Sequence, residues 1–115
     1  MMRYSIKLQP TFVKEAKRLG KRYPSITSDI QNIGKDLLKN PEIGVDLGCG
    51  LRKIRMRITS KGRGKSGGAR VITFNVVAAI DETVINLIYI YDKADRSNIS
   101  TNEIEQLLKN NGLNK

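Results

Sequence analysis

Residues 51–70 have the sequence LRKIRMRITSKGRGKSGGAR, which holds eight cations and no acidic residue. Its first part alternates basic and apolar side chains, and residues 71–79 after it are apolar and rich in β-branched residues. Four glycines lie between these two runs, and glycine adopts turn conformations that other residues resist. The stretch therefore predicts two β-strands joined by a glycine-rich turn.

The first predicted strand, residues 51–58, has two chemically different faces. Successive side chains of a strand point to opposite faces, so the apolar residues are expected to pack and the basic ones to face outward. No Asp or Glu occurs between Asp46 and Asp81, so the eight cations have no local partners and would repel one another. A partner's phosphates or carboxylates would neutralise them. The packed face is expected to hold Ile54, Met56 and Ile58, and the basic face Lys53, Arg55 and Arg57.

Arg70 and the last predicted strand hold further candidates for a site. Arg70 lies two and four residues before Ile72 and Phe74, so in a regular strand all three side chains point to the same face. This predicts a cation on the packed face or at its margin. In the strand predicted at residues 84–92, the same parity places five side chains on one face: Ile85, Leu87, Tyr89, Tyr91 and Lys93. Tyr89 and Tyr91 are expected to be half-buried, with Tyr91 placed to reach a site at the end of the strand.

The remaining segments complete an α+β domain. A strand is predicted at residues 3–8, helices at 11–22 and from 25 or 27 to 38, and a loop at 42–50. Ser100 and Glu103 have the spacing of a capping box, which predicts a final short helix. We expect one domain over residues 1–115, with the order β-α-α-β-β-β-α and an antiparallel sheet whose helices pack on one face.

Composition limits the chemistry of this chain. The formal net charge of +10 indicates an anionic partner. One Cys and no His exclude an intramolecular disulfide and argue against a zinc site, and we expect no cofactor. Gly64-Lys65-Ser66 is not a P-loop, because position 59 is Thr and a strand follows.

Without a signal peptide or an apolar run of membrane-spanning length, we expect a cytoplasmic protein with no membrane partner.

Several of these motifs occur together in one known family. The chain from Phe12 to Leu108 resembles the RelE/HigB branch of the type II toxin-antitoxin (RelE/ParE) superfamily. The resemblance includes Asn40-Pro41 and Gly44, and its most specific part is the Gly-Lys-Ser-Gly-Gly-Ala-Arg run at 64–70. It rests on Leu51-Arg52-Lys53-Ile54-Arg55, Gly64-Lys65-Ser66-Gly67-Gly68-Ala69-Arg70-Val71-Ile72, Ile90-Tyr91-Asp92-Lys93, Asn98-Ile99-Ser100 and Glu103-Ile104.

The resemblance implies a metal-independent endoribonuclease, an mRNA interferase that inhibits translation, typically on the ribosome. It also implies a cognate antitoxin, which we expect to be a small helix-turn-helix protein. Such a site uses cations and a Lys or Tyr instead of histidines. Ala94 and Ser100 stand where well-studied relatives have an arginine and a tyrosine. The expected catalytic residues are Arg55, Arg70, Lys93 and Tyr91, and the expected RNA-binding residues are Lys53, Arg57, Arg63 and Lys65.

Two other functions are compatible with this sequence. A ParE-type toxin of the same fold would act on DNA gyrase, although retention of Arg55, Arg70 and Lys93 favours RNA cleavage. A non-catalytic basic RNA-binding protein would use aromatic residues on its basic sheet, but no Phe or Tyr occurs in residues 51–70.

Overall fold

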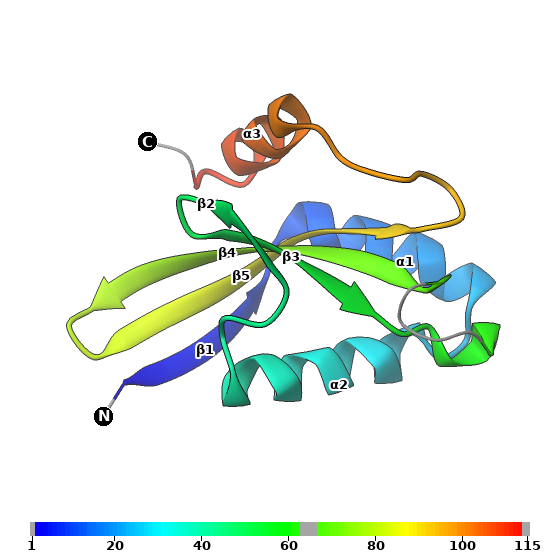
Figure 1. The fold of residues 1–115 in the computed structure, drawn as a ribbon, viewed down its shortest axis with the longest axis horizontal. Helices are drawn as coiled ribbons and strands as arrows, with labels where there is room; N and C mark the ends of the chain where they lie inside the picture. Colours follow the sequence, from blue (N-terminus) through cyan, green and yellow to red (C-terminus); the bar gives the residue numbers. More distant parts are fainter. Residues whose placement is uncertain (1, 63–66, 114–115) are drawn as a thin grey trace.

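The computed structural model describes residues 2–62 and 67–113 of the chain. Within these residues the chain forms a mixed sheet with helices on both of its faces (Figure 1). The elements in order are β1 (Arg3–Leu8), α1 (Pro10–Arg22), α2 (Ile26–Lys39), β2 (Val45–Gly48), β3 (Leu51–Met56), the 3-10 turn η1 (Thr59–Lys61), β4 (Ala69–Ala79), β5 (Glu82–Asp92) and α3 (Thr101–Asn110).

The sheet has the strand order β1-β5-β4-β3-β2. The strands β2 to β5 pair antiparallel with their neighbours, whereas β1 returns to the far edge and runs parallel to β5. The predicted α+β class is confirmed. The central pair, β4 and β5, forms the longest hairpin, because both segments are long runs of β-branched and aromatic residues.

Each face of the sheet has its own apolar core. The first core joins α1 and α2, through residues such as Phe12 and Leu37, to the face that carries Ile54. The second core joins Ile104 and Leu108 of α3 to the opposite face. Packing of α1 and α2 on one face agrees with the prediction, but α3 covers the other face (Figure 1). The reason is that Ile72 and its neighbours leave apolar surface there that needs a cover.

A register shift in β5 changes which of its side chains share a face. Ile72 pairs with Tyr89, but the next residue, Thr73, pairs with Leu87, so Ile88 is an extra residue. Leu87 consequently lies in the first core, while Tyr91 lies in the second. The prediction that Ile85, Leu87, Tyr89 and Tyr91 share one face was wrong, because a bulge of one residue reverses the alternation beyond it.

The segment 42–50, predicted as a loop, contains the short edge strand β2. All four residues of β2 are exposed, so this strand lacks the buried alternation by which strands are recognised. A tight turn with positive φ at Cys49 and Gly50 leads from β2 into β3.

Local sequence determines where the helices begin and how they are held. Pro10 occupies the first turn of α1, where its missing N–H costs no hydrogen bond. The predicted capping box of α3 is present, since Ser100 and Glu103 exchange both hydrogen bonds. In α2, the buried Asp29 carboxylate accepts hydrogen bonds from the backbone and the hydroxyl of Thr59, which ties η1 to the helix. No helix in the described residues is long and apolar enough to cross a membrane.

Candidate active site

Three neighbouring strands place Arg55, Arg70 and Tyr91 in one row across the sheet. Arg55 of β3 lies opposite Arg70 of β4, and Arg70 lies opposite Tyr91 of β5. Directly opposed residues in antiparallel strands extend from the same face with their Cβ atoms about 5 Å apart. We call these three residues the catalytic row, after the role that the sequence predicted for them. The structure thus brings together three of the four residues that the sequence proposed as catalytic.

The two arginines of the row differ in exposure. Arg70 is only 7% exposed and donates a hydrogen bond from Nη1 to the carbonyl of Ala69 at 3.2 Å. Arg55 is exposed and forms no hydrogen bond or ion pair with any residue that the structure describes. Guanidinium groups present several N–H donors in a plane and bind phosphate oxygens in pairs. The sheltered Arg70 and the exposed Arg55 could therefore bind a phosphodiester together, once the phosphate has lost part of its water shell.

The hydroxyl of Tyr91 is buried without a hydrogen-bond partner among the described residues. The whole residue is 2% exposed. Burial raises the pKa of Tyr91 above its ordinary value, although the positive charges of Arg70 and Arg96 act in the opposite direction. The hydroxyl therefore stays protonated at neutral pH. An unpartnered, protonated hydroxyl beside two arginines can donate a proton to a bound anion.

Arg96 completes this site, and the sequence reasoning did not find it. Its guanidinium carbon lies 5.5 Å from the centre of the Tyr91 ring, over the ring. Glu103 holds it by an ion pair of 2.7 Å, and the carbonyl of Asn98 accepts from its Nε at 2.8 Å. Arg96 belongs to the connection between β5 and α3, where no strand or helix period predicts the direction of a side chain. The one nearby feature that the sequence predicted was the capping residue Glu103, which turns out to be the ion-pair partner of Arg96.

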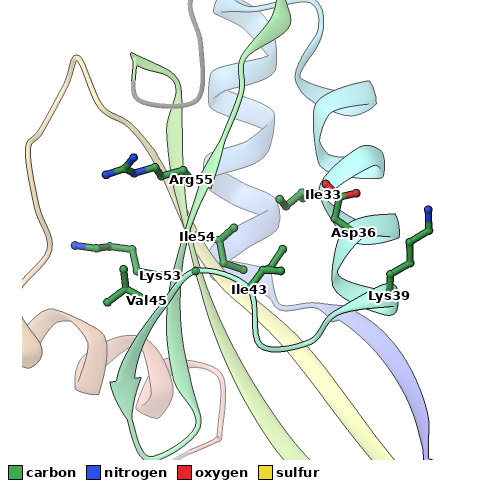
Figure 2. A pocket seen from close by; sticks show the side chains of 9 residues that line it. Ile33, Asp36, Lys39, Ile43, Val45, Lys53, Ile54 and Arg55 are labelled. Carbon is green, nitrogen blue, oxygen red and sulfur yellow. The ribbon is translucent and has the colours of Figure 1, made fainter.

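Lys53 lies one row away from Arg55 on the same face. Figure 2 shows the side chains of Lys53 and Arg55 extending to the same side of β3, while Ile54 points toward Ile33 of α2. This confirms the predicted alternation of β3. The Nζ of Lys53 donates a hydrogen bond to Oδ1 of Asn98 at 3.1 Å, which joins β3 to the connection that carries Arg96.

A pocket of about 540 Å³ lies between β3 and α2. Figure 2 shows the side chains that line it. Its apolar wall is formed by Ile33, Ile43 and Ile54. Lys53 and Arg55 border this pocket, but their charged ends extend away from it. We therefore place the candidate chemistry on the opposite side of β3, at the catalytic row.

The other predicted site residues lie outside the row. Lys93 follows β5, and its Nζ donates to the carbonyl of Ser97 at 3.5 Å. Arg57 follows the end of β3 and is exposed. Arg63 and Lys65 lie outside the described residues.

Lys61 and Arg52 lie close to acidic side chains, which corrects the prediction that the cations of residues 51–70 lack acidic partners. Nζ of Lys61 lies 2.6 Å from the buried carboxylate of Asp92. Arg52 donates to the carbonyls of Ile43 and Gly44 and lies near Asp46. The absence of nearby acids in the sequence did not exclude partners that folding brings close.

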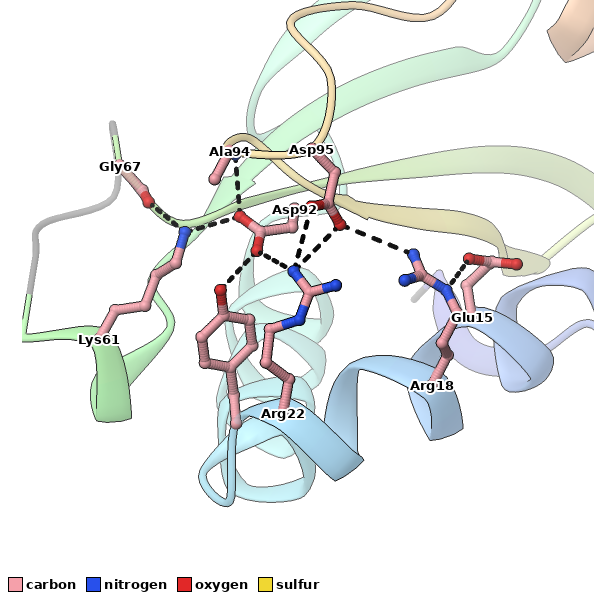
Figure 3. A network of polar contacts seen from close by, with 9 residues as sticks. Glu15, Arg18, Arg22, Lys61, Gly67, Asp92, Ala94 and Asp95 are labelled. Atoms are coloured by element: carbon pink, nitrogen blue, oxygen red, sulfur yellow. Dashed lines mark hydrogen bonds and ion pairs between the residues drawn. The ribbon is translucent and has the colours of Figure 1, made fainter.

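Asp92, at the end of β5, forms hydrogen bonds with residues at the end of α1 and in η1 (Figure 3). Its carboxylate accepts hydrogen bonds from Lys61, from Arg22 at 3.1 Å, and from the hydroxyl of Tyr23 at 2.6 Å. Burial would raise the pKa of Asp92, but the hydrogen bonds from Lys61, Tyr23 and the Ala94 amide outweigh it and lower the pKa to about 2. Lys61 also donates to the carbonyl of Gly67 at 3.0 Å. Asp92 thereby holds both described ends of the glycine-rich connection, next to Tyr91.

The side chains of the described residues do not form a group of three or more His, Cys, Asp or Glu suited to a metal ion. The chemical groups that the site offers are the three guanidinium ions of Arg55, Arg70 and Arg96, the protonated phenol of Tyr91 and the nearby ammonium group of Lys53. Fold and site together define a small basic α+β protein whose sheet presents two arginines and a tyrosine in one row.

A comparison with protein families identifies the class more closely. The family model described as the RelE toxin of the RelE / RelB toxin-antitoxin system matches residues 9–113. The chain belongs to this family of toxins, and the family implies an antitoxin as its partner.

Proposed function

We propose that this toxin is a metal-independent mRNA endoribonuclease that acts on the translating ribosome. The observation that carries the proposal is the catalytic row, in which Arg55, Arg70 and Tyr91 lie side by side on three strands. A toxin that only occupied a protein target would have no need for a sheltered arginine next to a buried, protonated phenol.

In the proposed reaction the 2′-hydroxyl of a ribose attacks the adjacent phosphorus. A bond forms between the 2′-oxygen and phosphorus, and the bond from phosphorus to the 5′-oxygen of the next nucleotide breaks. The products are a 2′,3′-cyclic phosphate and a free 5′-hydroxyl. Arg70 and Arg55 stabilise the negative charge that develops on the phosphoryl oxygens. Tyr91 donates its proton to the departing 5′-oxygen. Water accepts the proton that the 2′-hydroxyl loses, and Tyr91 later regains a proton from water.

Arg96 has two positions in this mechanism. In the free toxin it lies over the Tyr91 ring and pairs with Glu103. When RNA binds, Arg96 turns from Glu103 to the phosphate and exposes the hydroxyl of Tyr91. Arg96 would then supply the cation that Ala94 cannot.

Cations outside the row guide the RNA. Lys53 and Arg57 contact neighbouring phosphates, as do Arg63 and Lys65 of the glycine-rich connection. The net charge of +10 favours binding to a large polyanion such as the ribosome. A small helix-turn-helix antitoxin holds the toxin inactive.

The test compares Arg70→Met with Lys35→Met, a matched loss of one charge at an exposed position of α2. Met keeps much of the side-chain volume of the sheltered Arg70, so the fold should persist. We expect Arg70→Met to lower the rate of mRNA cleavage by about 100-fold or more, as removal of a transition-state donor does. Lys35→Met should cleave like the wild type. Cleaved ends are mapped with and without ribosomes, and gyrase supercoiling is assayed in parallel.

Absence of cleavage by the wild type under both conditions would refute the proposal. Inhibition of gyrase without cleavage would favour the ParE-type activity instead. Cleavage by Arg70→Met at the wild-type rate would remove Arg70 from the mechanism.

A further inference from the structure

A cleft beside the catalytic row is lined by residues of α3 and of the turn from β2 to β3. Figure 1 shows that these two segments lie next to each other. Its volume is about 460 Å³, and apolar walls are formed by Leu47, Leu51, Ile99 and Leu108. The mechanism proposed above does not use this cleft. Its apolar walls and few polar groups are those of a site for a small molecule.

We propose that this cleft binds the nucleobase next to the cleaved bond and selects bases that carry an exocyclic amino group. The proposal rests on the ribonuclease function argued above. It assigns a base-reading role to Glu105, Asn98 and Thr101, which supply the polar groups of the cleft.

The position of the cleft along β3 supports a nucleotide as its occupant. Leu51, Lys53 and Arg55 alternate along one face of the strand, so each lies about 7 Å from the next. Leu51 lines the cleft, Lys53 lies at its rim, and Arg55 belongs to the catalytic row. An extended RNA strand can therefore place one phosphate at Arg55 and the next at Lys53. The base of the nucleotide that these two phosphates flank would then enter the cleft beyond Lys53.

Lys53 connects the two sites chemically. In the free protein its ammonium group donates to Oδ1 of Asn98, and both residues line the cleft. A phosphate at the rim would draw Lys53 away and release the Asn98 amide for a base edge. Charge complementarity thus favours a nucleotide over an uncharged apolar ligand, because Lys53 and Arg55 provide positive charge where the backbone would pass.

The polar groups of the cleft indicate which bases would be preferred. The Glu105 carboxylate is acceptor-only when ionised, so it favours a base with an amino group, such as cytosine. Uracil offers a carbonyl at the position of the cytosine amino group and would place oxygen against oxygen. We expect this single contact to make cleavage next to uracil about tenfold less frequent than cleavage next to cytosine.

The first experiment maps the ends of mRNA cleaved on ribosomes by the wild type, by Glu105→Ala, and by the control Glu42→Ala. Glu42 is an exposed acid that does not line this cleft, so the two variants lose the same charge. The wild type and the Glu42 variant should avoid uracil next to the cut by about tenfold. Glu105→Ala should cleave with little of this bias. Equal base preference in all three proteins would overturn the proposal.

The second experiment does not depend on cleavage. Cys49 is exposed, lines the cleft, and is the chain's single cysteine. Its rate of alkylation is measured with oligodeoxycytidine and with oligothymidine, which cannot be cleaved because they lack the 2′-hydroxyl. We expect oligodeoxycytidine to slow alkylation severalfold more than oligothymidine does. Equal alkylation rates would overturn the inference, even if the toxin cleaves RNA. A wild type that cleaves no RNA would instead refute the proposed function.

Discussion

Tyr91 combines deep burial with a hydroxyl that has no hydrogen-bond partner among the described residues. A buried polar atom without a partner costs stability, so its presence in a folded chain calls for a functional reason. The raised pKa of Tyr91 keeps its proton in place at neutral pH. Both observations agree with a proton donor that finds its partner only when RNA is bound.

Replacement of Tyr91 by Phe should separate activity from stability. Because the hydroxyl has no described partner, we expect the free energy of unfolding to change by less than about 1 kcal/mol. The cleavage rate should fall by about 100-fold or more, because proton transfer is lost. Chemical denaturation and single-turnover cleavage measure the two effects, with Tyr4→Phe at the exposed edge strand as a control. A strongly destabilised variant, or one with full activity, would argue against Tyr91 as the donor.

Lys53 should contribute to RNA affinity by displacing counterions from a phosphate. We expect Lys53→Met to reduce the slope of log affinity against log salt concentration by about 1. Titrations of a single-stranded RNA at several salt concentrations provide the slopes. Lys35→Met on α2 should leave the slope unchanged, and a Lys53 variant that behaves in the same way would remove Lys53 from the RNA path.

Among the secondary-structure elements, β5 connects the site to the rest of the fold. Because side chains alternate along the strand, Tyr91 points to the face of the catalytic row, whereas Asp92 points to the opposite face and contacts α1. The bulge at Ile88 is what allows this, because it changes the face of Tyr91 without moving the strand out of the sheet. The short helix α3 covers the same face and holds Arg96 through its capping residue Glu103.

The Asp92 network should make the stability of the fold depend on acid. The folded pKa of about 2 lies below the ordinary value of 3.8, so Asp92 stabilises the folded state above pH 4. This contribution, about 2 kcal/mol, should be lost as the pH falls from 4 through 2. Asp92→Asn should be destabilised at pH 7 by about 3 kcal/mol, since Lys61 loses its charged partner, and should lose this acid dependence.

Urea denaturation between pH 2 and pH 7 measures both effects. Asp36→Asn is the matched control, because Asp36 is exposed on α2 and forms no ion pair within the described residues. An Asp92 variant that retains the wild-type pH dependence would show that other carboxyl groups are responsible.

For the molecule as a whole, we expect charge and apolar surface to provide different parts of antitoxin binding. The net charge of +10 favours an acidic partner and a fast encounter. A groove of about 620 Å³ between α1 and α2, lined by apolar residues with Lys17 and Lys21 at its side, offers an anchor for apolar side chains. Ion pairs at a wet interface add little net affinity, so the anchor should provide most of it.

We therefore expect the rate of antitoxin association to fall as salt concentration rises, while the dissociation rate changes little. Stopped-flow mixing of toxin and antitoxin over a salt series measures both rates. An association rate that is insensitive to salt would leave apolar docking as the sufficient explanation.

Local patterns in the sequence were enough to predict most elements of this fold. The alternation in β3 predicted the burial of Ile54, Met56 and Ile58, because a strand with one packed face must alternate. The parity of Arg70 predicted a sheltered arginine, and the spacing of Ser100 and Glu103 predicted the start of α3. These features depend on residues that are close in sequence, so a short window contains the information.

Contacts between distant segments could not be predicted in the same way. The row of Arg55, Arg70 and Tyr91 depends on the register of three strands, and a bulge at Ile88 decides which face Tyr91 occupies. Lys61 is paired with Asp92, and Arg96 lies over Tyr91, because the connections between strands and helices bring them there. A shift of one residue in strand pairing would reverse these side chains, and strand register is decided by packing across the whole sheet.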